Sequence, residues 1–136
     1  MSAPLTIHHL ALGARDVATL AAFYRFALGL PERARHHRPD GTLRSIWLAL
    51  GEGEGAPMLM VEADETGGER PAPSAKPEPG WFLVALRARD DAHRRELEGA
   101  LERAGSPIEA RTAATSYARD PEGNRVAISV FCFEEA

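Results

Sequence analysis

An internal repeat constrains the fold of this chain more than any other feature of its sequence. The stretch from Ile7 to Asp16, IHHLALGARD, returns in a degraded form from Trp81 to Asp90 as WFLVALRARD. In each copy a short apolar run ends in an aspartate, and helical rather than alternating spacing follows. This order is typical of a strand that leads into a capped helix. The chain is therefore predicted to consist of two related halves.

The length, charge and cysteine content limit the kinds of protein this chain can be. Its 136 residues fit one domain, because a chain of this size buries roughly two thirds of its unfolded surface. The net charge is −4 and the basic residues are scattered, so nucleic acid is not expected as a partner. Cys132 is the single cysteine, which excludes an intramolecular disulfide and a cysteine-rich zinc site.

Features of secreted and membrane proteins are not found in the sequence. The N-terminal residues have neither a basic flank nor a long apolar run, and no later run approaches membrane-spanning length. We therefore expect a soluble cytoplasmic protein without a membrane partner. Small molecules or other proteins are the partners that this composition favours.

The first half is predicted to fold in the order β-α-β-β-β. Alternating apolar residues indicate its strands, and apolar residues at three- and four-residue steps indicate its helix. Asp16 is expected to cap the helix, and Gly29 followed by Pro31 is expected to end it. The predicted elements are strands over 5–12, 31–37, 43–50 and 57–63 and a helix over about 17–28.

Residues 64–79, DETGGERPAPSAKPEP, separate the two halves. They contain four prolines, two glycines and no large apolar residue, which is typical of a linker or a mobile flap. Within a single domain over 1–136, the first module is thus predicted over about 1–63 and the second over about 80–136.

The second half is predicted to repeat the order β-α-β-β-β. Asp90 or Asp91 is expected to cap a helix that runs to about Ala104. Asp-Pro-Glu-Gly at 120–123 has the residue choice of a type I turn and should close the last hairpin. The predicted strands open at 81 and lie near 108–111, 116–119 and 125–133.

Together these features resemble the vicinal oxygen chelate superfamily, which includes glyoxalase I, bleomycin-resistance proteins and extradiol dioxygenases. The resemblance covers essentially the whole chain. It rests on the two halves, the HLAL strand before a capped helix, the helix exit LGLP, and YARDPEGNRVAISV over 117–130. It implies an α+β fold in which two βαβββ modules form a U-shaped, partly closed mixed sheet around a concave cavity, with helices on the convex side. A homodimer is also expected, whether the cavity forms within one chain or between two.

Strand alternation predicts which side chains line the concave cavity, because the aliphatic phase of each strand should face the helices. Aromatic rings and thioethers on the other phase suit a flat apolar ligand, although they could equally fill a core or a dimer contact. Arg119 and Arg125, near the hairpin mouth, could neutralise an acidic ligand or be solvated. The residues expected to bind a ligand are His9, Trp47, Met58, Met60, Trp81, Leu83, Tyr117, Arg119 and Ala127.

The resemblance implies four metal positions in the metal-dependent members: His, Glu, His or Gln, and Glu on the first, fourth, fifth and eighth strands. In this chain they fall on His9, Met60, Leu83 and Ala127. Because Zn, Ni, Mn and Fe ions need several imidazole or carboxylate ligands, neither a metal nor another cofactor is expected. Glu62, two residues or about 6.6 Å beyond Met60, could contribute only after a register shift.

The sequence therefore predicts metal-independent binding of an apolar or aromatic molecule, as in sequestration-type resistance proteins of that superfamily. One alternative is a metal-dependent lyase, isomerase or dioxygenase with a non-standard ligand set around His9. Another is an interaction or regulatory subunit with a vestigial pocket. His9 could act as an acid or base or be an ordinary hydrogen-bonded residue, so no catalytic residue is assigned.

Overall fold

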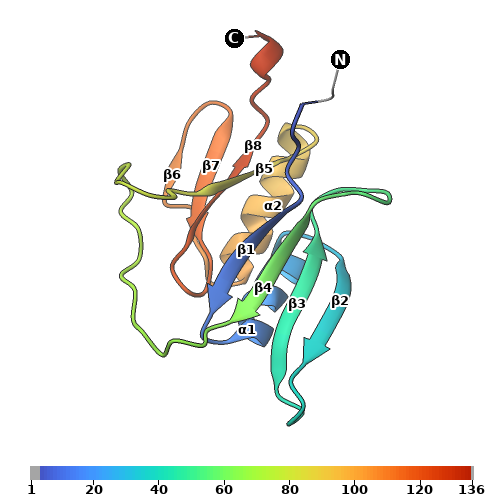
Figure 1. Cartoon of the computed structure of the whole chain (residues 1–136). Coiled ribbons are helices and arrows are strands. Elements are labelled where there is room, and N and C mark those ends of the chain that lie inside the picture. The colour runs from blue at the N-terminus through green and yellow to red at the C-terminus, as the bar shows by residue number, and fades with distance from the viewer. Residues whose placement is uncertain (1–3, 136) are drawn as a thin grey trace. The chain divides into compact units, whose positions relative to one another are not determined.

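The computed structural model describes residues 4–135. The chain divides into one unit over Met1–Gly67 and a second over Gly68–Ala136. Each unit has one four-stranded mixed sheet, and its helix lies against one face of that sheet (Figure 1). The sheets do not close into a barrel, so the predicted α+β fold of two βαβββ modules is confirmed.

The first unit has the predicted order of elements. These are β1 (His9–Ala14), α1 (Val17–Ala22), a π-helical segment η1 (Phe23–Ala27), β2 (Glu32–His37), β3 (Leu43–Ala49) and β4 (Met58–Ala63). The strands lie in the order β1-β4-β3-β2. β1 pairs with β4 in parallel, and the other neighbours are antiparallel.

Local hydrogen bonds set both ends of the first helical segment. The Asp16 carboxylate accepts from the Thr19 backbone N–H at 3.0 Å and from the Thr19 hydroxyl at 2.8 Å, as an N-cap does. These bonds lower the pKa of Asp16. At the other end Gly29 has a φ of 76°, and the N–H of Leu30 donates to the carbonyl of Tyr24 at 3.0 Å. A glycine in this conformation is the usual way for a helix to end.

The second unit repeats the order of the first with shorter strands. Its elements are β5 (Val84–Arg87), α2 (Asp91–Arg103), β6 (Ala110–Arg111), β7 (Thr115–Arg119), β8 (Arg125–Ser129) and a 3-10 turn η2 (Phe133–Glu135). They form a sheet in the order β5-β8-β7-β6. The predicted strand from Trp81 begins only at Val84, since Trp81 is 92% exposed and has no sheet neighbour to bury it.

Both sheets have the same register, so the internal repeat extends to their paired residues. In each unit a residue of the first strand pairs with a residue of the last strand. That residue in turn pairs with a residue of the strand that precedes the last one in the chain. The two equivalent rows are Ala11–Met60–Trp47 and Ala85–Ala127–Tyr117. Met60 is therefore the structural counterpart of Ala127.

The core of each unit lies between its helix and one face of its sheet. In the first unit the buried side chains include Leu20, Tyr24, Ile46, Leu48, Leu59 and Val61, and in the second Leu101, Ala118, Val126 and Ile128. In the second unit the helix buries Leu101, whereas Ala104, which follows its last turn, is exposed. We call the sheet surface that is turned away from the helix the open face. No helix within residues 4–135 has the length and apolar character to span a membrane.

Candidate ligand-binding site

The open face of the first sheet carries four of the residues that the sequence predicted to bind a ligand. The strand register arranges its side chains in rows that cross the sheet. These rows are Ala49–Met58–His9, Ala34–Trp47–Met60–Ala11 and His36–Ser45–Glu62–Gly13. The structure thus brings His9, Trp47, Met58 and Met60 onto one surface, and their binding of a ligand stays a prediction.

His9 lies at the exposed edge of this surface. Its Nδ1 is 2.9 Å from the Nδ1 of His8, so one imidazole donates and the other accepts. The two rings meet edge to face with their centroids 5.2 Å apart. Among residues 4–135, no carboxylate orients the His9 ring as it would orient a general base. This geometry favours a lining role for His9 over a catalytic one.

His36 also contributes to the open face, from the edge strand β2. Its ring lies against that of Trp47, with centroids 4.5 Å apart and planes inclined by 58°. Alternate residues of β2 are half-buried, and His36 is one of them, while its neighbour His37 is exposed. The strand therefore has a half-buried side, which its polar composition does not reveal.

In the second unit, residues 70–82 are attached to the sheet, and we name this segment the strap. The Arg119 guanidinium donates to the carbonyl oxygens of Pro73 and, at 3.0 Å, Gly123. The Phe82 ring lies 4.9 Å from the guanidinium carbon of Arg125. Part of the predicted linker or mobile flap is therefore held on the second sheet.

Two arginines of this open face share one carboxylate. Glu109 accepts from Arg119 Nε at 3.2 Å and from Arg125 Nε at 2.9 Å. Burial opposes ionisation of Glu109, but the hydrogen bonds and charges of the two arginines outweigh it and lower its pKa. Arg125 is 6% exposed and also lies 4.3 Å from the Tyr117 ring. The alternative that both arginines are solvated is therefore wrong.

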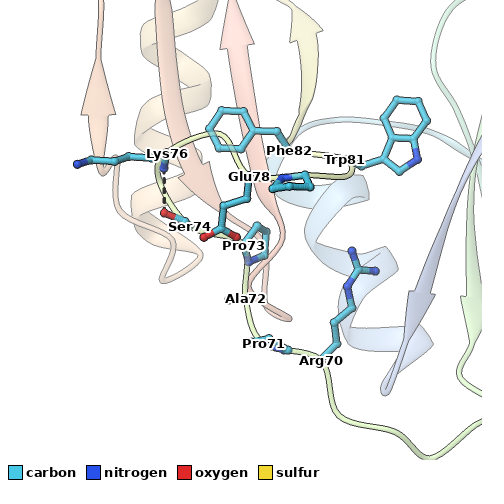
Figure 2. A pocket seen from close by; sticks show the side chains of 10 residues that line it. Arg70, Pro71, Ala72, Pro73, Ser74, Lys76, Glu78, Trp81 and Phe82 are labelled. Carbon is cyan, nitrogen blue, oxygen red and sulfur yellow. Dashed lines mark hydrogen bonds between the residues drawn. The ribbon is translucent and has the colours of Figure 1, made fainter.

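A pocket of about 390 Å³ lies along the strap (Figure 2). Prolines of the strap line it together with Trp81 and Phe82, whose side chains point in opposite directions from the strap. Its charged residues are Arg70, Lys76 and Glu78. Of the predicted ligand-binding residues only Trp81 lines this pocket, because the proline-rich composition indicated a linker and carried no signal of a cavity wall.

Leu83 and Ala127 complete the set of predicted residues. Leu83 is half-buried and immediately precedes β5, while Ala127 lies on the open face of β8 and is 1% exposed. The shared register identifies Met60 rather than Glu62 as the counterpart of Ala127. A shift that exchanges Met60 for Glu62 is thus not seen.

The four positions that the resemblance assigns to a metal do not fit a divalent ion. His9 supplies an imidazole, but Met60, Leu83 and Ala127 supply a thioether and two alkyl groups. Zn, Ni, Mn and Fe ions in proteins are held by several nitrogen, carboxylate or thiolate ligands. Within the described part of the chain, no three His, Cys, Asp or Glu side chains come close enough together to hold an ion.

Comparison with known proteins agrees with the fold. A glyoxalase-like domain family matches residues 9–129. No curated protein has a significantly similar sequence. Among solved structures, a lactoylglutathione lyase from Agrobacterium tumefaciens is 24% identical, with 94% of this chain and 95% of that chain covered and a TM-score of 0.64.

Two further structures show the same architecture. A fosfomycin resistance protein from Mesorhizobium loti is 12% identical, covers 99% of this chain and 97% of its own, and has a TM-score of 0.70. A glyoxylase/bleomycin resistance protein/dioxygenase domain from a Frankia species is 18% identical, with 96% and 100% covered and a TM-score of 0.69. At these identities the similarity shows the fold and leaves the ligand to be inferred from the residues.

Proposed function

The chain belongs to the glyoxalase-like family of the vicinal oxygen chelate superfamily, and from this premise we propose that it binds a small, largely apolar or aromatic molecule without a metal ion. The proposal rests on the residues that stand where metal-dependent members of the superfamily have their metal ligands. Three of them hold Met60, Leu83 and Ala127, which cannot replace carboxylate or imidazole ligands of a divalent ion. The fold then keeps a binding surface but has no Lewis acid, which favours binding over catalysis.

Two features support an apolar or aromatic ligand. The open face of the first sheet offers the indole of Trp47 and the thioethers of Met58 and Met60, which make favourable contacts with flat rings. The pocket along the strap, of about 390 Å³, has room for a small molecule and is bounded by Trp81 and Phe82.

A panel of planar aromatic compounds and size-matched aliphatic compounds tests this proposal on tag-free protein. We expect some aromatic members to raise the melting temperature and to change tryptophan fluorescence, because a ligand that binds only the folded state stabilises it. Trp47→Ala should reduce the rise in melting temperature for ligands that bind the open face of the first sheet. Phe26→Ala, which truncates a ring that is 74% exposed on η1, should retain it. A panel that changes neither signal would contradict the proposal.

A metal-dependent lyase, isomerase or dioxygenase is the competing function. It is favoured by His9 and Glu62, which share one open face, and by the occurrence of a lactoylglutathione lyase among proteins with this fold. In that case tag-free protein should contain nearly stoichiometric Ni, Zn, Mn or Fe, and His9→Ala should lose it. Elemental analysis that finds only traces in both proteins would exclude this function.

A further inference from the structure

Three polar atoms on the open face of the first sheet are buried and have no hydrogen-bond partner within the described residues. They are His36 Nε2, Ser45 Oγ and Trp47 Nε1. His36 pairs with Ser45 across β2 and β3, and Ser45 and Trp47 are two residues apart on β3, so all three side chains are on one face. Ser45 is 0% exposed.

Such a cluster is unusual in a folded protein. Native structures pair the great majority of buried polar atoms, because an unpaired one loses its hydration without compensation. Three unpaired atoms in one place, on a face with aromatic and thioether side chains, indicate a position that a bound polar group fills. His36 lies on the edge strand β2, and its ring packs against that of Trp47.

The chemistry of these residues defines the group that fits. The Trp47 indole N–H only donates, and the Ser45 hydroxyl can donate as well, so a ligand oxygen that accepts from both satisfies them. On the other side of Ser45, Glu62 of β4 is its direct cross-strand neighbour and has a carboxylate that only accepts when ionised. The surface thus presents donors next to an acceptor.

We propose that this position binds the carboxamide of a planar aromatic ligand. The amide oxygen accepts from Trp47 Nε1 and Ser45 Oγ, and the amide N–H donates to Glu62. A carboxylate at the same place would bring a second negative charge beside Glu62, and a ketone would leave Glu62 without a donor. This inference rests on the proposed function and narrows its ligand class.

The test compares 2-naphthamide, 2-acetonaphthone and 2-naphthoate, which share one ring system and differ in the polar group. The chain has two tryptophans, so two indole N–H signals are expected in the spectrum of ¹⁵N-labelled full-length protein, and Trp81→Phe assigns them. We expect 2-naphthamide to bind most tightly and to shift the Trp47 indole proton downfield. The shift reports on the hydrogen bond itself, which a merely structural tryptophan would not show.

Variants separate the individual hydrogen bonds. Trp47→Phe and Ser45→Ala should each weaken 2-naphthamide binding roughly fivefold to tenfold, since each removes one donor. Glu62→Gln should improve 2-naphthoate relative to 2-naphthamide, because the new amide can donate to a carboxylate. Ser106→Ala, which truncates a buried serine just after α2, should keep wild-type affinities. If Trp47→Phe fails to fold, Ser45→Ala and Glu62→Gln still decide the result.

The outcomes that overturn the inference are distinct from those that overturn the proposed function. If 2-naphthamide binds but the Trp47 signal does not move, or if the ratio of the 2-naphthamide and 2-naphthoate affinities is unchanged in Glu62→Gln, the carboxamide position is wrong while ligand binding stands. If none of the three compounds binds to the wild-type protein, the carboxamide position falls, and the panel of aromatic compounds decides separately whether the chain binds a ligand.

Discussion

Each unit buries a serine on its sheet, and the two serines differ in whether the hydroxyl has a hydrogen-bond partner. Ser116 on β7 is 1% exposed and donates its hydroxyl hydrogen to Glu98 of α2. Ser45 on β3 is 0% exposed, and its hydroxyl has no partner within residues 4–135. Because an unpaired buried hydroxyl loses hydration without compensation, the two side chains should affect stability with opposite sign.

The matched variants Ser45→Ala and Ser116→Ala measure this difference. Ser45→Ala should raise the free energy of unfolding of the ligand-free protein by about 1 kcal/mol, because it removes an unpaired polar group. Ser116→Ala should lower it by about 2 kcal/mol, because Glu98 loses a donor. Urea unfolding followed by circular dichroism provides both values. A clear loss of stability in Ser45→Ala would contradict this account of the first sheet.

The candidate site was partly predictable at the residue scale. Alternation along the strands is a local property, and it placed His9, Trp47 and Met60 on one face as the structure does. The partner of Arg125 was not predictable, since Glu109 lies 16 residues away and outside any strand. Nor could the sequence show that the Ser45 hydroxyl has no partner among the described residues, because that depends on the side chains around it.

At the scale of elements, α2 is tied to its sheet by Glu98. This carboxylate accepts from Arg111 Nε of β6 at 2.9 Å and from the Ser116 hydroxyl of β7. The hydrogen bond from Arg111, supported by that from Ser116, outweighs the effect of burial and lowers the pKa of Glu98 below its ordinary value of 4.5. The ionised form of Glu98 is therefore favoured by folding.

The pH dependence of stability follows from the sign of this shift. A folded pKa below the unfolded value gives a contribution that is fully present above pH 4.5 and is lost as the pH falls through the folded pKa. The stability difference between wild type and Glu98→Gln should thus shrink below pH 4.5, whereas Glu96→Gln, at an exposed position of α2, should track the wild type. Urea unfolding from pH 7 to about pH 3 measures it. A difference that grows on acidification would contradict the assigned role.

Arg119 provides one of the contacts that hold the strap, the hydrogen bond from its guanidinium to the Pro73 carbonyl. Arg119→Gln removes the guanidinium that donates to Pro73 and Gly123, so residues 70–82 should exchange their amide hydrogens faster while α2 keeps its protection. Arg103→Gln, at the exposed end of α2, is the matched control. Hydrogen exchange measured by mass spectrometry would show unchanged rates in the strap if Arg119 did not hold it.

The order of the elements was predictable because the signals for strands, caps and turns are local. Asp16 and Gly29 lie at the two ends of the first helical segment, as expected. The predicted turn at 120–123 is closed by a hydrogen bond of 2.9 Å from the Gly123 N–H to the Asp120 carbonyl. No sequence signal predicted the change from α- to π-helix at Phe23, and the docking of the strap depends on contacts between residues far apart in the sequence, such as Arg119 with Pro73. Such contacts leave no periodic pattern in the sequence.

At the scale of the whole molecule, we propose a homodimer. Within residues 4–135, each unit leaves the open face of its sheet without a helix. Aromatic side chains are exposed after β8, with Phe131 44% and Phe133 76% accessible. These rings meet edge to face at 5.3 Å and form a small apolar patch that a second copy could cover.

Sedimentation velocity at micromolar concentration tests this proposal. We expect a species of twice the chain mass, and Phe133→Glu should shift it towards the monomer because a charge would then be buried in the interface. Glu134→Gln, a change at the neighbouring exposed position, should remain dimeric. A wild-type protein that sediments as a monomer would contradict the proposal.

Calorimetric titration of the tightest aromatic ligand into one protein sample, with and without EDTA, shows whether ligand binding needs a metal ion. The metal content of the same sample is measured in parallel. We expect the same dissociation constant in both titrations and less than stoichiometric Ni, Zn, Mn and Fe. Binding that EDTA abolishes and that Ni or Zn restores would contradict metal-independent binding.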